Sequence, residues 1–308
     1  MLRVGLLTST QAMLIGLFAP ICWGMSVSLV RGIAEGFGMA LGQFFLYCVA
    51  TICVFFHCRF AGLSSYRQAV SLFRHTDGKP ELSEFLSGHL YFERRRADDG
   101  SRHVNYLWPS LTILFAVLFN GVRTRWWLYP GLLAAFGGII VILSGDKGFS
   151  LTEFVARFAE NPVSYLLALV AAVTWAGYSS MTRAWGNGIN PSTIIFAVDT
   201  LVFLVLWLLD IGSQPVAASA HGLMSVIFGG IAVGMAYVVW TLGMSKGNIT
   251  VLAAASYFTP VLSCVFATFW IGAELNSSFW MGVVLVVVGS LLCWDATGRG
   301  IKKFLKAA

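Results

Sequence analysis

Two matched groups of aromatic and polar residues are the strongest candidates for ligand chemistry in this sequence. Each group ends at a proline inside an apolar run, and the members are Asn105, Tyr106, Trp108 and Pro109 in the first and Tyr257, Thr259 and Pro260 in the second. A proline within a helix removes a hydrogen bond and displaces the carbonyl four residues earlier, here at Asn105 and Ser256. In lipid, a freed carbonyl is tolerated only where protein or a water-filled cavity satisfies it. The paired helix kinks therefore favour a substrate pathway, and a kink that only improves helix packing is the alternative.

Five further aromatic residues lie within apolar runs instead of at their ends, and they are Trp23, Trp175, Tyr178, Tyr237 and Trp240. Trp and Tyr in membrane proteins usually anchor the chain at the interface. Trp23 and Trp175 are inside their runs and match each other at an offset of 152 residues. Stacking on a ligand and packing in the core are both compatible with this pattern.

Asp199 is the one acidic residue well inside a clear apolar run. Ionisable groups within membrane spans are functional candidates, so Asp199 is a possible coupling residue, for proton exchange or for binding an amine. The alternative is that the Asp199 side chain reaches toward the membrane surface at the start of its helix, because Asp199 lies only eight residues after Pro191.

Signals for enzyme chemistry, metals and cofactors are missing from the sequence. None of the five histidines lies in the middle of a clear span beside an acid or a second histidine, and no H-E-x-x-H, G-x-S-x-G or Walker sequence occurs. The six cysteines form no C-x-x-C pair and fall within or at the ends of apolar runs, which is typical of packing residues. We therefore expect no enzyme activity, no cofactor and no bound metal.

Composition indicates a membrane protein. Hydrophobic residues make up 57% of the 308 residues and charged residues 11%, with a mean hydropathy of +0.78, whereas about 25% of residues are charged in a soluble domain. The net charge of +6 comes mostly from short loops and the tail, so it indicates topology more than nucleic-acid binding. The lipid bilayer is the expected environment, and no nucleic-acid partner is expected.

The two halves of the chain repeat one another. Tyr106, Pro109 and Gly131 precede Tyr257, Pro260 and Gly282 by 151 residues, and Trp23 precedes Trp175 by 152. Such spacing indicates an internal duplication. Nine apolar stretches are long enough to span a bilayer, at 11–30, 38–58, 104–120, 126–144, 162–182, 191–209, 223–244, 249–271 and 278–294.

The third span of the first half is missing, and residues 72–93 stand where the repeat predicts it. Residues 74–103 hold 12 of the 34 charged residues in the chain, and each charge at a bilayer centre costs about 2.5–3.5 kcal/mol. The offset changes by only one residue across this region, so length is kept while hydrophobicity is lost. We hypothesise a local reading-frame error over about 69–103, and a divergent polar hairpin is the alternative.

Loop charges support ten spans with a cytoplasmic N-terminus. Leaving out 69–103, the cytoplasmic segments then hold eleven basic residues, Arg3, Arg59, Arg67, Arg123, Arg125, Arg183, Lys246, Arg299, Lys302, Lys303 and Lys306. The opposite side holds three, Arg31, Lys147 and Arg157. This distribution satisfies the positive-inside rule. Five spans per half is an odd number, so the two repeats should have inverted topology, as in many transporters.

These features together resemble the EamA branch of the drug/metabolite transporter superfamily, and within it the bacterial aromatic amino acid exporters. The resemblance rests on the repeated five-span halves, Trp23 with Arg31, and the segments VNYLWPSL at 104–111 and SYFTPVLS at 256–263. It implies an all-α membrane protein of ten helices around a central cavity, built from two inverted five-helix repeats, with the third helix lost or scrambled at about 69–103. Members of the group carry a Tyr-Glu pair in the third helix and an acidic residue just before the Asn-Tyr-Leu-Trp motif, and neither is present here.

The expected organisation is a first EamA-like repeat at 1–145, an inter-repeat loop at 146–161, and a second repeat with a basic tail at 162–308. The resemblance implies export of aromatic and other neutral amino acids across the bacterial inner membrane by alternating access, with both termini cytoplasmic. Two alternatives remain, a broad-specificity exporter of drugs or metabolites and a non-transporting membrane protein whose third span is disrupted. The predicted substrate-binding residues are Trp23, Asn105, Tyr106, Trp108, Trp175, Tyr178, Tyr237, Trp240, Tyr257 and Thr259.

Overall fold

The computed structural model describes residues 7–61, 104–184, 192–211, 216, 218–272 and 274–296. This part of the chain is helical and contains no strand. The helices are α1 (Ser9–Gly16), α2 (Phe18–Phe37), α3 (Met39–Ala61), α7 (Trp108–Asn120), α8 (Leu128–Ser144), α9 (Leu151–Glu160), α10 (Pro162–Ala184), α11 (Ser192–Leu208), α12 (Ala220–Lys246), α13 (Ile249–Ser256), α14 (Thr259–Ile271) and α15 (Ser277–Ala296), with a short 3-10 turn at Gly145–Lys147. The expected third span at 72–93, and the whole aberrant segment at 69–103, lie outside the described residues.

Several helices are long and apolar enough to cross a membrane. Among the described residues, four pass by length and composition alone, at Ser9–Phe37, Met39–His57, Ala220–Lys246 and Ser277–Ala296. A pair of shorter helices, α13 and α14, qualifies when taken together. Helices α7, α8 and α11 are apolar but shorter. The apolar helices confirm the prediction of an all-α membrane protein.

The first predicted span is longer in the structure than in the sequence analysis. Helix α1 begins with a capping box, in which the Thr8 side chain accepts from the backbone of Gln11 and the Gln11 side chain accepts from the backbone of Thr8. The helical run then continues through α2 to Phe37, where Gly38 ends it with a φ of 71°. Arg31 therefore lies inside this helix, where it pairs with Glu35 one turn later.

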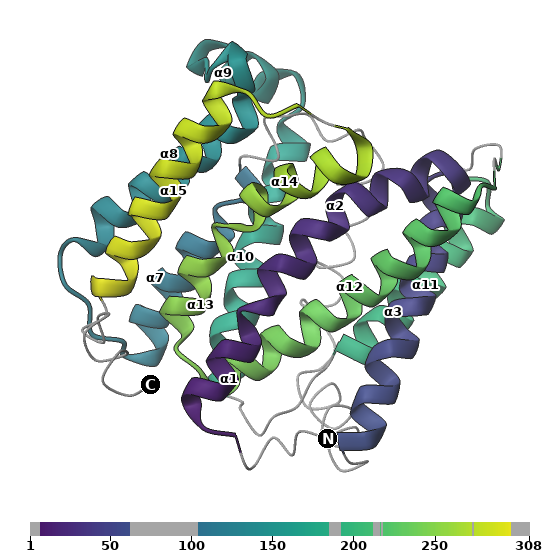
Figure 1. Cartoon of the computed structure of the whole chain (residues 1–308), viewed down its shortest axis with the longest axis horizontal. Helices are drawn as coiled ribbons and strands as arrows, with labels where there is room; N and C mark the ends of the chain where they lie inside the picture. The colour runs from purple at the N-terminus through teal and green to yellow at the C-terminus, as the bar shows by residue number, and fades with distance from the viewer. Residues whose placement is uncertain are drawn as a thin grey trace.

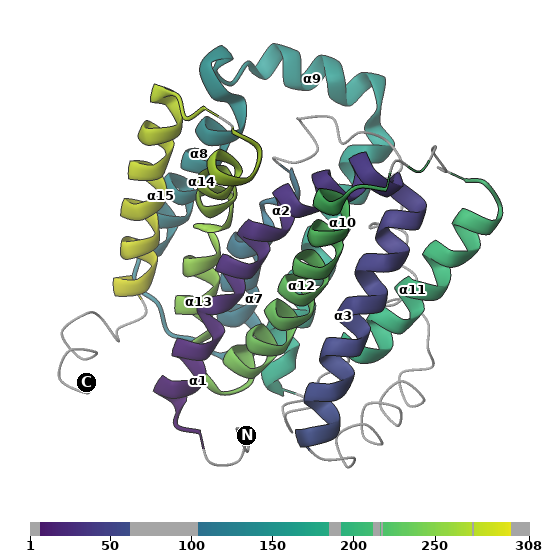
Figure 2. The same cartoon turned by 45° about the vertical axis from the view of Figure 1, so that its right-hand side comes forward.

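The segment expected to be an inter-repeat loop contains a helix. Ser150 caps α9, which then bends by 99° into the following helix α10. In Figure 2, α9 lies across one end of the molecule while the other helices run toward that end. None of its residues is buried, and Leu151, Val155 and Phe158 are among its exposed apolar side chains.

The two proline-containing helices are interrupted at matching places. The Leu107 amide donates to the Val104 carbonyl (3.1 Å), and the Phe258 amide donates to the Ala255 carbonyl (3.0 Å), 151 residues later. Each tight turn is followed by a new helix, with Pro109 or Pro260 in its first turn. A first-turn proline loses no helical hydrogen bond. The interruption therefore precedes each proline, whereas the sequence analysis placed a kink within a continuous helix.

Helices α8 and α15 pack closely along their length through matched glycines. A Cβ on Gly138 would lie 2.7 Å from the Gly282 carbonyl oxygen, and a Cβ on Gly289 would lie 2.6 Å from the Gly131 carbonyl oxygen. Residue numbers rise along one helix as they fall along the other, so the pair is antiparallel. The two helices stand side by side in Figure 1.

Other helix pairs follow the same internal symmetry. Helix α2 packs on α14, and the corresponding helices of the other half, α10 and α7, also pack on each other. Helix α3 packs on its own counterpart α11. A contact pattern in which counterparts meet is what a two-fold relation between the halves produces.

Candidate functional site

Four helices bring six of the predicted binding residues into one group. Helices α2, α7, α10 and α12 meet at the middle of the molecule, as Figures 1 and 2 show. The residues that they contribute, which we call the aromatic cluster, are Trp23, Trp108, Trp175, Tyr178, Tyr237 and Trp240.

Trp23 lies at the centre of the aromatic cluster. Its ring centroid is 5.9 Å from that of Trp108, 5.6 Å from Trp175, 5.9 Å from Tyr237 and 5.1 Å from Trp240. Most of these pairs meet edge to face, the arrangement that aromatic rings prefer over a direct face-to-face stack. The surrounding rings also touch one another, so each half of the chain supplies part of a continuous aromatic surface.

Hydrogen bonds fix the orientation of two rings in the aromatic cluster. The indole Nε1 of Trp240 donates to the Ser179 hydroxyl at 3.1 Å, and both residues are buried. The Tyr178 and Thr241 hydroxyls lie 3.1 Å apart and share a hydrogen bond. Helices α10 and α12 are therefore joined by two polar contacts at the edge of the aromatic cluster.

Small residues allow α2 to approach its neighbours closely enough to carry Trp23 into the aromatic cluster. A Cβ on Gly24 would lie 2.7 Å from the Leu262 Cβ on α14. Close approach through small residues is how membrane helices pack without a hydrophobic driving force. Position 24 cannot accept a larger side chain unless α2 and α14 move apart.

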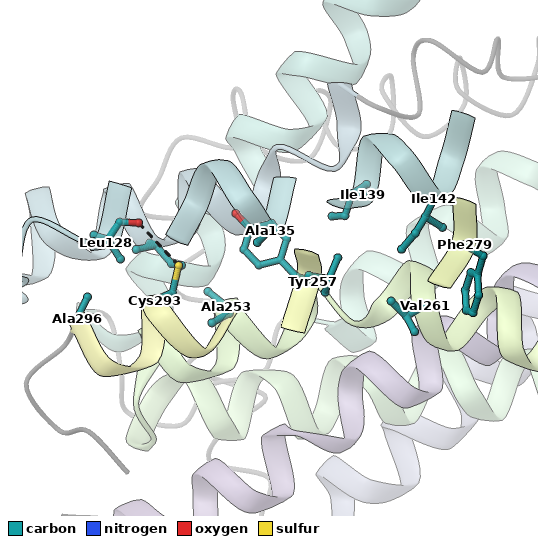
Figure 3. Packing of buried hydrophobic residues seen from close by; sticks show 13 residues of the cluster. Leu128, Ala135, Ile139, Ile142, Ala253, Tyr257, Val261, Phe279, Cys293 and Ala296 are labelled. Carbon is teal, nitrogen blue, oxygen red and sulfur yellow. Dashed lines mark hydrogen bonds between the residues drawn. The ribbon is translucent and has the colours of Figure 1, made fainter. Parts of the chain in front are cut away.

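The remaining predicted residues lie elsewhere. Tyr257 is fully buried in a second core, formed largely by α8, α13 and α15, and Tyr106 packs against the same core. Figure 3 shows Tyr257 beside Ala135 and Ala253, in a row that also includes Cys293, whose thiol faces the Leu128 carbonyl. The Tyr257 hydroxyl shares a hydrogen bond with the Ser110 hydroxyl of α7. The predicted set therefore divides between the aromatic cluster and this second core.

Thr259 and Asn105 are placed near the helix interruptions. Thr259 is 6% exposed, and its hydroxyl finds no hydrogen-bond partner among the described residues. Asn105 is half-buried in the short helical segment that precedes α7. Neither residue contributes a ring contact to the aromatic cluster.

Asp199 lies close to the aromatic cluster without belonging to it. It is 1% exposed, on the part of α11 where Phe196 contacts Tyr237 with ring centroids 4.9 Å apart. Asp199 also interacts electrostatically with Tyr237. Both carboxylate oxygens are buried and have no hydrogen-bond partner in the described part of the chain.

Ser179 and Thr241, the two hydrogen-bond partners of the aromatic cluster, were not among the residues predicted from the sequence. A spacing signal was present, because Trp175, Tyr178 and Ser179 are separated by the same intervals as Tyr237, Trp240 and Thr241. Residues three and four apart share one face of a helix. Polar residues at such positions could therefore have been assigned to the same site as the rings.

A metal-binding group does not appear among the described residues, where no three side chains of the His, Cys, Asp and Glu types are grouped closely enough to hold an ion. The five cysteines whose side chains are described, Cys22, Cys48, Cys53, Cys264 and Cys293, are free thiols. The site that emerges is a membrane-embedded group of large aromatic rings with a few hydroxyls at its edge. Such an arrangement presents flat apolar surfaces of the kind that pack against another aromatic ring.

Comparison with known proteins gives a consistent result. Residues 162–294 match the EamA-like transporter family. The chain is 38% identical over 302 residues to the aromatic amino acid exporter YddG of Salmonella typhimurium, covering 95% of this chain and 100% of that protein. It is 37% identical over 300 residues to the protein of the same name from Escherichia coli, covering 96% and 100%. A protein of known crystal structure superposes with a TM-score of 0.75 over 94% of this chain and 99% of that one, at 24% identity, so the two share a fold.

Proposed function

The chain belongs to the EamA-like transporter family, and from that membership we propose that it exports aromatic and other neutral amino acids. The observation that carries this proposal is the aromatic cluster. Its six rings come from helices of both halves and lie within the apolar body of the molecule. Two relatives covered over their whole length carry the name aromatic amino acid exporter, which agrees with a site built from rings.

Recognition of the substrate side chain would depend on Trp23 and its neighbours. Edge-to-face contacts between aromatic rings contribute about 0.5–1.5 kcal/mol each beyond the burial of area. A phenylalanine, tyrosine or tryptophan side chain could replace one of the contacts that the rings now make with one another. The carbonyls near the interruption before α7, together with Asn105, would meet the charged amino and carboxyl groups.

The proposed architecture is a ten-helix transporter made of two inverted five-helix repeats that works by alternating access. The antiparallel contact of α8 with α15 supports the inversion, because counterpart helices run in opposite directions there. The matched interruptions before α7 and α14 support a pathway between the repeats, since interrupted helices mark binding sites in many transporters. This architecture requires a third span in the first repeat, where the chain has the polar segment at 69–103.

The proposed location is the bacterial inner membrane, with both termini cytoplasmic. Basic residues in the short loops support this orientation. It places Arg123 in the cytoplasm and α9, with Glu153, on the opposite side. Cysteines introduced at positions 123 and 153 in a background without other cysteines should therefore react with an impermeant maleimide from opposite sides. Labelling of both from one side would contradict the orientation and the inversion of the repeats.

Efflux from proteoliposomes tests the function directly. Vesicles that contain the full chain and are loaded with labelled phenylalanine should release it faster than protein-free vesicles loaded in the same way. Trp23→Ala should slow the release at least tenfold, because it removes the ring at the centre of the aromatic cluster. Trp126→Ala is the matched control, since Trp126 is 74% exposed and lies outside the cluster.

The pattern of released compounds separates the alternatives. Efflux of unrelated drugs as fast as that of phenylalanine would replace the proposal with a broad-specificity exporter. No efflux of any compound would point to a non-transporting protein, and a version with an apolar third span at 72–93 would then show whether the polar segment is the cause. Efflux that is unchanged by Trp23→Ala would show that the aromatic cluster is core and not site.

A further inference from the structure

Asp199 is a buried acid without a partner. It lies near the middle of α11, with 1% of its surface exposed, and neither carboxylate oxygen has a hydrogen-bond partner among the described residues. An isolated carboxylate in an apolar environment is unfavourable unless a cation or a proton compensates its charge. The position therefore calls for a positively charged ligand.

Aromatic side chains of α11 itself and of the neighbouring helices α3 and α12 lie around Asp199. Phe196 and Phe203 lie one turn before and one turn after it on the same face of α11, and the Tyr47 ring of α3 lies 5.8 Å from the first and 5.6 Å from the second. Tyr47 therefore extends across the level of Asp199. On the other side, Tyr237 of α12 contacts Phe196 and interacts electrostatically with Asp199.

Among the described residues, no fixed cation faces Asp199 from the helices packed against it. The titratable groups at its level are Tyr47 and Cys48 of α3 and Tyr237 of α12. The other titratable side chains described on these helices are Cys53 and His57 on α3, one to three turns beyond Cys48, and His221 and Lys246 near the two ends of α12. The part of the chain that the structure describes therefore supplies no fixed charge to compensate Asp199, and a mobile species can take that role.

A proton fits this position better than a metal ion or the substrate amine. Metal cations such as Ca²⁺ take six or more oxygen ligands, whereas α11 is an unbroken helix at this point and its carbonyls are engaged in helical hydrogen bonds. Asp199 is only 1% exposed, so a substrate amine would have to displace the side chains that cover it. A proton needs one oxygen and no additional space.

We propose that Asp199 is the proton-binding site that couples the export of an amino acid to the entry of a proton, an assignment that rests on the proposed function. In the arrangement seen here, α3 and α11 close over Asp199 and the side chain holds the proton as a neutral carboxylic acid. When the repeats move apart, the O–H group transfers its proton to water on the cytoplasmic side, leaving a carboxylate. The carboxylate takes up a new proton when it is exposed to the outside.

The position of Asp199 explains how one proton could control substrate movement. Tyr237 belongs to the aromatic cluster and also lies beside Asp199, so a change of charge at Asp199 acts on a ring that contacts Trp23 and Trp175. One proton exchanged for one zwitterionic amino acid moves one positive charge inward. A gradient of one pH unit then sustains a tenfold gradient of substrate.

The test uses the full chain in proteoliposomes and two assays. In the first assay, labelled phenylalanine exchanges for unlabelled phenylalanine at equal pH on both sides (counterflow), which reports substrate exchange alone. In the second, the vesicle interior is one pH unit more acidic than the medium, and accumulation of phenylalanine inside the vesicles reports coupling to protons. The wild type should show both, with accumulation approaching tenfold. Asp199→Asn should keep counterflow within about twofold and lose accumulation. Asp210→Asn is the matched control, because Asp210 is exposed just beyond the end of the same helix, and it should keep both.

Other outcomes overturn the assignment in distinguishable ways. Wild-type counterflow without any response to the pH gradient would reject proton coupling and leave the proposed function intact, whereas absence of wild-type counterflow would reject the proposed function itself. If Asp199→Asn lost counterflow of phenylalanine but kept that of 3-phenylpropionate, Asp199 would be an amine-binding residue and not a proton site.

A second measurement does not depend on the stability of a variant. Phenylalanine added to the purified wild type in weakly buffered detergent solution should release protons, up to one per protein molecule, because substrate and proton compete. Release of no protons would overturn the proposal. Asp199→Glu keeps an acid at the position, so it should retain accumulation with a shifted pH dependence.

Discussion

Trp108 and Thr259 occupy matching positions in the two halves of the chain, 151 residues apart, and each opens a helix with a proline in its first turn. The backbone around them is the same. The preceding tight turns match, and both helices end at a glycine in the left-handed region, Gly121 with a φ of 62° and Gly272 with a φ of 68°. The side chains have different surroundings, because Trp108 joins the aromatic cluster and the Thr259 hydroxyl is buried with no hydrogen-bond partner among the residues that the structure describes.

A second matched pair differs in the same way. Asp199 lies 152 residues after Tyr47, and the Tyr47 ring contacts Phe196, one turn before Asp199, where α3 packs on α11. One half supplies an aromatic ring at this position and the other supplies an acid. The comparison teaches that the two halves share their backbone and helix contacts at these positions, while their side chains at the centre of the molecule differ.

The largest expected effect comes from giving the first half the residue of the second. Trp108→Thr removes an indole whose ring centroid lies 5.9 Å from that of Trp23, 6.1 Å from that of Trp175 and 5.7 Å from that of Trp240. Loss of about 1.4 kcal/mol of aromatic contact corresponds to a tenfold change in rate. We expect phenylalanine efflux to fall at least tenfold at equal amounts of reconstituted protein. Efflux close to wild type would mean that the two halves are interchangeable at this position.

The next largest effect is expected at the close contact between α8 and α15, and it tests whether matching glycines of the two halves are equally sensitive to substitution. Gly138→Ala places a Cβ 2.7 Å from the backbone of α15, whereas nothing lies within 4 Å of a Cβ on Gly137. Overpacking of this kind costs about 1–3 kcal/mol, so Gly138→Ala should lower the thermal stability measured by size-exclusion chromatography after heating. Gly137→Ala serves as the matched control and should be neutral. Gly289→Ala, at the matching position of the second half, should be as harmful as Gly138→Ala.

A smaller effect is expected from removing the hydrogen bond between Tyr257 of the second half and Ser110 of the first. Tyr257→Phe removes the hydroxyl that bonds to Ser110, and a hydrogen bond of this kind contributes about 0.5–1.5 kcal/mol. Stability should fall by that amount, and Ser110→Ala added to Tyr257→Phe should cost little more. Additive losses in this double-mutant cycle would show that the two hydroxyls act separately.

Much of the helical framework could be predicted from the sequence, because apolar length and an internal repeat are strong signals. The spans at 126–144 and 278–294 agree closely with α8 and α15. The helix α9 was missed because its ten residues combine apolar and charged side chains, which in the sequence look like a polar loop. The proline correctly signalled a break near Asn105, but it did not reveal that Pro109 lies in the first turn of a new helix instead of within one kinked helix.

The candidate site was predictable only in part. Trp23, Trp175 and Trp240 could be selected because they lie inside apolar runs, and the structure brings them together. Tyr257 was selected because it flanks Pro260, but it lies in the second core, because a residue number gives its depth in a span and not the helix that it faces. Only packing between helices distant in the sequence separates these two outcomes.

The smallest expected effect belongs to Thr259, and it sharpens the comparison with Trp108. The Thr259 hydroxyl is buried with no hydrogen-bond partner in the described part of the chain. Replacing an unsatisfied buried hydroxyl by a methyl group of similar shape is nearly neutral or stabilising. We therefore expect Thr259→Val to leave phenylalanine efflux unchanged and to keep or slightly raise thermal stability. A severalfold loss of efflux with stability intact would show that the hydroxyl meets the substrate, and the second half would then contribute a polar contact where the first half contributes a ring.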